Sequence, residues 1–144
     1  MALFGQGYNC AQSVLLAYAD LLEPDRRTLA RLASSFGGGM GRLREVCGAL
    51  SGAFMAAGLL YGYEDPGDAT AKAEHYRRIQ EIAAGFRERC GSLICRELLG
   101  LTEQQDDPTP SPRTASYYEE RPCMRLVGTA AALLDDYLAA HSPD

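Results

Sequence analysis

Residues 46–61, VCGALSGAFMAAGLLY, decide the fold of this chain. The segment is apolar, and its small residues recur every four positions, which places them in rows along a helix. The segment is shorter than the roughly 20 residues that a helix needs to cross a bilayer. We therefore expect a closely packed central helix of the core. The rows comprise Gly48, Gly52 and Ala56, and Ala49, Ala53 and Ala57.

Capping patterns predict two helices before this segment. Asn9 and Gln12 form a capping-box pattern that predicts a helix over 9–22. Asp25 is placed to cap a second helix. The glycine run at 37–41 must end that helix, because glycine is unfavourable in helix interiors.

The remainder of the chain contains signals for three more helices. An amphipathic pattern predicts a long helix that ends near Cys90. Ser92 is placed to cap a short helix, and Pro122 to occupy the first position of the last one. Three prolines and few apolar residues predict a long mobile loop over 102–120. No segment shows sustained alternation, so the predicted class is all-α with about five to six helices.

Length, charge and cysteine number restrict the function classes. At 144 residues we expect one compact helical domain over 1–144. A net charge of -5 leaves no excess of cations for phosphates, which argues against a nucleic-acid partner. The N-terminus shows no basic region followed by an apolar stretch, so we expect a cytoplasmic location and no membrane insertion. Five cysteines there would be reduced, and an odd number cannot pair completely within one chain.

Four of the five cysteines fall in a predicted first helical turn. The unpaired amide groups and the positive end of the helix dipole favour a thiolate there. We therefore expect lowered cysteine pKa values and a shared anionic centre, with nearby arginines acting in the same sense. Cys90 lies at a helix end, where the dipole has the opposite effect, so its role is secondary. The four cysteines are Cys10, Cys47, Cys95 and Cys123.

These cysteines occur within longer motifs, which are GYNCAQSV at 7–14, FGGGMG at 36–41, CGALSG at 47–52 and GSLICRELLG at 91–100. With the late cysteine, they make the chain resemble, over nearly its whole length, a family named for the cysteine pattern C, CGAxxG, C, C. The resemblance implies a small helical protein for which redox activity is proposed without an established reaction. The four characteristic cysteines of that family fall here on Cys10, Cys47, Cys95 and Cys123.

Three kinds of centre are compatible with four such thiols. The leading hypothesis is an iron–sulfur cluster for electron transfer, because ligation by four cysteines is its usual mode. The second is thiol–disulfide exchange, in which the cysteines themselves are the catalytic redox thiols. The third is a structural zinc site in an interaction module, although such sites usually have ligands in close pairs. The predicted catalytic, cofactor-binding or metal-binding residues are in every case Cys10, Cys47, Cys95 and Cys123.

The alternative without a common centre is that the cysteines are small buried side chains at helix starts. A common centre requires the four sulfurs to cluster in the fold. If the sulfurs were scattered, the only remaining roles for the cysteines would be pairwise thiol chemistry or packing. For a redox centre we expect a redox partner protein or a small-molecule thiol as partner. Whether the chain forms a homo-oligomer through the small-residue helix stays open.

Overall fold

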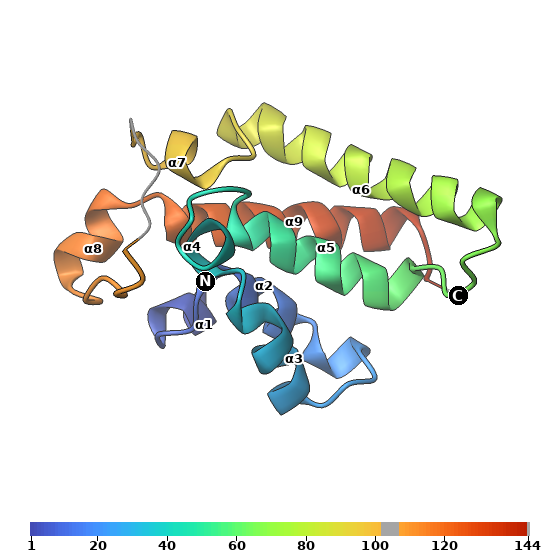
Figure 1. The fold of residues 1–144 in the computed structure, drawn as a ribbon, viewed down its shortest axis with the longest axis horizontal. Helices are drawn as coiled ribbons and strands as arrows, with labels where there is room; N and C mark the ends of the chain where they lie inside the picture. The colour runs from blue at the N-terminus through green and yellow to red at the C-terminus, as the bar shows by residue number, and fades with distance from the viewer. Residues whose placement is uncertain (102–106, 144) are drawn as a thin grey trace.

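The computed structural model describes residues 1–101 and 107–143, and the all-α class is confirmed. Three long helices, α5 (Gly48–Tyr61), α6 (Ala69–Cys90) and α9 (Cys123–Ala140), run side by side and form the body of the molecule (Figure 1). Helix α2 (Cys10–Ala17) packs against α5, α9 and α3 (Arg26–Ser34). The N-terminal third of the chain therefore flanks the long helices (Figure 1).

Helix α5 is the buried, closely packed helix that its small residues predict. Ala53, Ala56 and Ala57 are fully buried. A Cβ atom at Gly52 would lie 2.5 Å from the carbonyl oxygen of Ala11 in α2. Any side chain at this position would therefore separate the two helices. No helix within 1–101 and 107–143 is long and apolar enough to cross a membrane.

Helix α2 begins where the capping box predicts but ends earlier than expected. Asn9 Oδ1 accepts a hydrogen bond from the Gln12 N–H at 2.8 Å, and the Asn9 N–H donates to Gln12 Oε1 at 3.1 Å. The helix predicted over 9–22 stops at Ala17, and a single 3₁₀ turn, η1 (Ala19–Leu21), follows it. The capping box thus fixes the next residue, a cysteine, in the first helical turn.

The described residues contain more helical segments than the five to six expected, because short helices form in the connections. One of them, α8 (Ala115–Glu120), lies in the region 102–120, so the loop prediction is wrong for its last six residues. Thr114 caps α8 by accepting a hydrogen bond from the Tyr117 N–H at 3.2 Å. Residues 102–106 lie outside the described residues. The other short helices are α1 (Ala2–Gly5), α4 (Gly37–Met40) and α7 (Cys95–Leu98).

The starts of several helices meet at one end of the molecule. Helix α4 contacts α2, α5 and α7 there, and α9 begins at the same end after α8 (Figure 1). The predicted caps of two of these helices are displaced. Ile94, not Ser92, precedes α7, because the Ser92 hydroxyl accepts from the Ile94 N–H at 3.0 Å in a turn before the helix. Pro122 immediately precedes α9 instead of opening it.

Candidate functional site

Two segments far apart in the sequence pair through an isolated antiparallel bridge and carry two of the cysteines. The Cys47 N–H donates to the carbonyl oxygen of Leu93 at 2.8 Å. The Cys95 N–H donates to the carbonyl oxygen of Glu45 at 2.6 Å. The bridge therefore holds the starts of α5 and α7 next to each other. The sequence contains no strand-like alternation that predicts this pairing.

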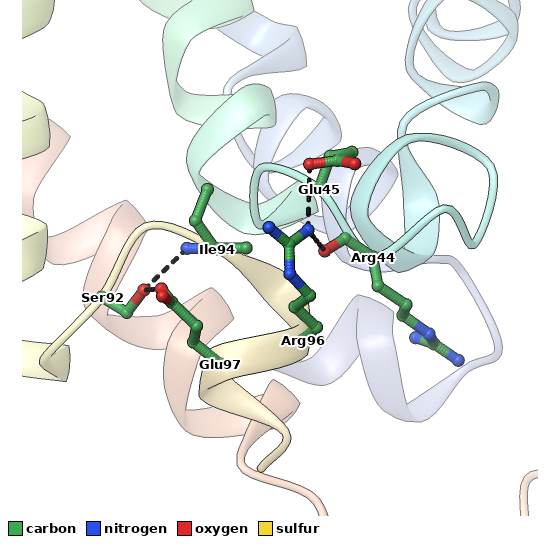
Figure 2. Close-up of polar contacts among 6 residues, drawn as sticks. All are labelled: Arg44, Glu45, Ser92, Ile94, Arg96 and Glu97. Atoms are coloured by element: carbon green, nitrogen blue, oxygen red, sulfur yellow. Dashed lines mark hydrogen bonds and ion pairs between the residues drawn. The ribbon is translucent and has the colours of Figure 1, made fainter. Parts of the chain in front are cut away.

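Side chains reinforce this bridge on both sides (Figure 2). Arg96 Nη1 donates to the Glu45 carboxylate at 3.1 Å and to the carbonyl oxygen of Arg44 at 3.3 Å. The Ser92 hydroxyl donates to the Glu97 carboxylate. The side chain of Arg44 extends away from the Glu45–Arg96 ion pair (Figure 2). Away from this ion pair, the Arg44 guanidinium contacts the Cys95 sulfur.

The glycine run before the bridge allows a close approach of two backbone segments. Gly38, Gly39 and Gly41 have φ values of 68°, 72° and 63°, in the left-handed region that favours glycine. A Cβ atom at Gly39 would lie 2.6 Å from the Cβ atom of Cys95 and 2.8 Å from the backbone nitrogen of Glu45. Glycine is therefore required at this position both for its conformation and for the space it leaves.

The four helix-start cysteines line one pocket of about 270 Å³. Cys10, Cys95 and Cys123 are the first residues of α2, α7 and α9, and Cys47 immediately precedes α5. Cys90 does not line this pocket. The structure thus brings together the four predicted residues and separates them from the fifth. Other side chains of the pocket wall include Arg42, Arg44, Arg113, Tyr117, Arg121 and Leu126.

The shared pocket is not a preformed metal site. All five cysteines are free thiols. Within the described ranges, no three cysteine, histidine or acidic side chains are grouped so that they could hold a metal ion. The clustering of the cysteines is therefore a feature of the fold, whereas their redox or metal-binding roles stay predictions.

Burial, not the backbone at the helix start, dominates the ionisation of three of the pocket thiols. Desolvation raises the pKa of Cys10, Cys47 and Cys123 above the ordinary value for a cysteine. Hydrogen bonds from backbone N–H groups act in the opposite sense: those of Gly38 in α4 and of Ala11 at the start of α2 lower the pKa of Cys10. These hydrogen bonds have a smaller effect on the pKa than burial has. The expectation of lowered pKa values is therefore wrong for these three cysteines, because it ignored their depth in the pocket.

Alkylation of Cys123 is expected to be slow at neutral pH. Burial, followed by the charges of Cys10 and Cys95, raises the pKa of Cys123 to about 11. Only the thiolate reacts, so roughly one Cys123 in 3,000 is reactive at pH 7.5. In the reduced, metal-free protein, its iodoacetamide labelling rate should rise about tenfold per pH unit towards pH 11. Peptide mass spectrometry at several pH values measures this rate, and a plateau already near pH 8 would contradict the raised pKa.

Arg44 brings a buried cation to the pocket wall. Its side chain is 2% exposed, and its Nη1 lies 3.7 Å from the Cys95 sulfur as a hydrogen-bond donor. Arg42 and Arg121 also line the pocket. Two other arginines near the cysteines in sequence, Arg96 and Arg125, do not line the pocket, and Arg96 pairs with Glu45. Sequence proximity to a cysteine was thus an incomplete guide to a place in the pocket wall.

Residues 107–113, here called the strap, line the pocket on one side through Pro108, Pro110, Ser111 and Arg113. Arg42 holds the strap by donating from Nε to the carbonyl oxygen of Asp107 at 3.0 Å. Arg42 and Arg121 both donate to the Ser111 hydroxyl at 3.2 Å. The strap therefore joins the glycine-run segment to the segment before α9 along one side of the pocket.

Replacing Arg113 by alanine is expected to lower the free energy of unfolding by about 2 kcal/mol. Arg113 donates to the carbonyl oxygens of Phe4 at 2.9 Å and Tyr8 at 3.1 Å, and its guanidinium lies 4.3 Å from the centre of the Phe4 ring. The substitution removes all these contacts between the strap and the N-terminus. Urea unfolding followed by circular dichroism measures the effect. The control Arg77→Ala, at an exposed position, should change stability by no more than about 0.5 kcal/mol; equal effects of both variants would contradict this function of Arg113.

The fold and the pocket together define a small all-α protein whose characteristic feature is a pocket lined by four cysteines. A family model described as "Putative redox-active protein (C_GCAxxG_C_C)" matches residues 8–137. The chain belongs to this family, as its motifs predict. No match was found among curated proteins or among solved structures.

Proposed function

We propose that this protein is an electron-transfer protein that binds an iron–sulfur cluster on Cys10, Cys47, Cys95 and Cys123. The observation that carries the proposal is that these four thiols, from the starts of four helices, line one pocket. Four cysteine ligands are the usual ligand set of such clusters. Membership of the redox-active family is consistent with this function.

The residues of the pocket wall suit the charge of a thiolate-ligated cluster. Such a centre is anionic, and buried arginines such as Arg44 would offset its charge. The Arg44 Nε is buried without a hydrogen-bond partner, so the wall has an unused donor for an anionic group. When bound, the cluster supplies one-electron chemistry. Arg44 and Arg121 would stabilise its charge, and the strap would limit the access of water.

The present positions of the sulfurs do not suffice for ligation. No three candidate ligands of the described residues form a group that could hold a metal ion. The proposal therefore requires the four sulfurs to move towards each other on loading. It also requires the buried thiols to lose their protons, since cysteine binds metals as the thiolate and metal binding is linked to proton release.

Thiol–disulfide exchange is the second candidate, favoured by the proximity of Cys10 to its neighbours. The charge of Cys10 contributes to the raised pKa of both Cys47 and Cys123. The raised pKa values argue against rapid exchange, because attack requires a thiolate. A structural zinc site is the third candidate. Its ligands would be the same thiols, without the closely spaced pairs typical of such sites.

Anaerobic reconstitution distinguishes these candidates. Reduced protein is incubated with ferrous iron and sulfide, desalted, and analysed for iron, acid-labile sulfide and visible absorption. The proposal predicts stoichiometric iron and sulfide with a reducible chromophore, both in the wild-type chain and in the control Cys90→Ser. Colourless protein without iron would refute it. Bound zinc without a redox response would favour the structural site, and a reversible loss of two free thiols in thiol-trapping mass spectrometry would favour exchange.

The same proposal includes a partner that exchanges electrons with the cluster. A redox protein or a small-molecule thiol would supply or accept the electrons. The pocket wall contains several arginines and no acidic side chain among the described residues, so a partner surface or molecule with negative charge would be attracted to it.

A further inference from the structure

An uncompensated positive charge lies in the wall of the cysteine pocket. Arg44 is almost completely buried, and the only hydrogen-bond partner of its side chain among the described residues is the Cys95 sulfur at 3.7 Å from Nη1. Its Nε is buried with no partner. Within residues 1–101 and 107–143, no carboxylate forms an ion pair with it. A buried guanidinium that lacks both an anion and a full set of acceptors has lost its hydration without replacement.

The other arginines of the pocket differ from Arg44 because they already have oxygen acceptors. Arg42 and Arg121 donate to the Ser111 hydroxyl, and Arg113 donates to backbone carbonyl oxygens. No aspartate or glutamate of the described part of the chain lines the pocket, although the chain has a net charge of -5. The local charge is therefore opposite to the overall charge. This segregation makes the pocket attractive to an anion.

We propose that the pocket binds a small anion with an O–X–O edge, an oxyanion or a carboxylate, through Arg44. A guanidinium presents parallel N–H groups that match such an edge and form charge-assisted hydrogen bonds with it. The unpartnered Nε belongs to this guanidinium and supplies one of these donors once the guanidinium turns it towards the anion. The anion lies beside the Cys95 sulfur, in the pocket of about 270 Å³. The ligand class of this pocket in the metal-free protein is thus a small anionic molecule held next to a thiol.

This anion site is independent of cluster binding, since it concerns the reduced protein without metal. A protein that fails to take up iron can still bind the anion, and a protein that takes up iron can still lack the anion site. The two failures are therefore distinguishable in separate experiments on the same preparation.

The test is a titration of the reduced, metal-free full chain with sodium sulfate or sodium acetate, at an ionic strength held constant with sodium chloride. Thermal unfolding and the iodoacetamide labelling rate of each cysteine are measured. We expect a saturable rise in melting temperature. We also expect labelling of Cys95 to be about tenfold slower at ten times the dissociation constant, with Cys90 unchanged. Saturation at lower sulfate concentration indicates an inorganic oxyanion, and saturation at lower acetate concentration indicates the carboxylate of an organic molecule.

Variants of the arginines locate the site. Arg44→Gln should abolish the saturable response, and Arg44→Lys should weaken it, because lysine keeps the charge but lacks the planar fork. The control Arg77→Gln, at an exposed position of α6, should respond like the wild-type chain. The proposal is overturned if sulfate and acetate act no differently from chloride, or if Arg44→Gln keeps the full response. Should Arg44→Gln fail to fold, selective protection of Cys95 in the wild-type chain decides the question.

Discussion

Gly48→Ala is expected to lower the free energy of unfolding by about 3 kcal/mol. A Cβ atom at Gly48 would overlap the Cys10 sulfur and lie 2.7 Å from the carbonyl oxygen of Phe36. Relief requires Cys10 to turn away and the Phe36 carbonyl, just before α4, to move from α5, so packing is lost both at the pocket and between α4 and α5. Urea unfolding followed by circular dichroism gives the stability change. Iodoacetamide labelling of Cys10 should become faster in the same variant, because its thiol is less protected.

The same helix offers a matched control. Gly58 also lies in α5, but a Cβ atom there would meet nothing within 4 Å. Gly58→Ala should therefore raise the free energy of unfolding by up to about 1 kcal/mol, because alanine has the higher helix propensity. If Gly48→Ala were as stable as the wild-type chain while Gly58→Ala behaved as expected, the close approach of Gly48 to Cys10 and Phe36 would not be needed for stability.

The helical architecture was predictable where the signal is local. The small-residue rows of α5 and the capping box at Asn9 depend on residues within a few positions of each other, and the structure confirms both. The bridge between Val46 and Ile94 was not predictable, because single residues in extended conformation leave no periodic pattern. Helix α8 was missed because the loop prediction rested on three prolines, all of which precede Thr114, the residue that caps the helix.

The candidate site was predictable in its members but not in its electrostatics. Positions at helix starts and the family motif singled out four cysteines, and these four line one pocket. The sequence does not state how deeply a thiol is buried. Desolvation proved larger than the effect of the backbone N–H groups, and it reversed the expected direction of the pKa shift for Cys47. The contribution of Arg113 was missed for a similar reason, since the strap reaches Phe4 only through the tertiary fold.

The backbone around the glycine run explains why the pocket needs this particular sequence. Met40, Arg42 and Arg44 have positive φ values of 69°, 68° and 62°, which non-glycine residues rarely adopt. Such strained conformations persist where the surrounding structure enforces them, and they cluster at functional sites. Here they turn the chain sharply enough to bring the side chain of Arg44 to the pocket wall and its carbonyl oxygen to Arg96. The positive φ values and the burial of the Arg44 side chain at the pocket wall are therefore linked.

Cys10→Ser is expected to reduce the iron and acid-labile sulfide bound after anaerobic reconstitution by at least about tenfold. Cys10 interacts with the other pocket thiols: its charge contributes to the raised pKa of Cys47 and Cys123, and that of Cys95 contributes to its own. Serine has nearly the size of cysteine, so the variant should keep the fold and lose only the sulfur ligand. Circular dichroism checks the fold, and metal analysis measures the loss.

The control for this prediction is Cys90→Ser, because Cys90 is half-buried at the end of α6 and does not line the pocket. Cys90→Ser should bind as much iron and sulfide as the wild-type chain. Full iron binding by Cys10→Ser would exclude Cys10 as a ligand and leave a centre of at most three cysteines. If neither the wild-type chain nor the variants bind iron, and Cys10→Ser alone loses a reversible two-thiol oxidation, Cys10 acts by disulfide exchange instead. Because Cys10 is a cluster ligand in one chemistry and a redox thiol in the other, this one substitution is decisive between them.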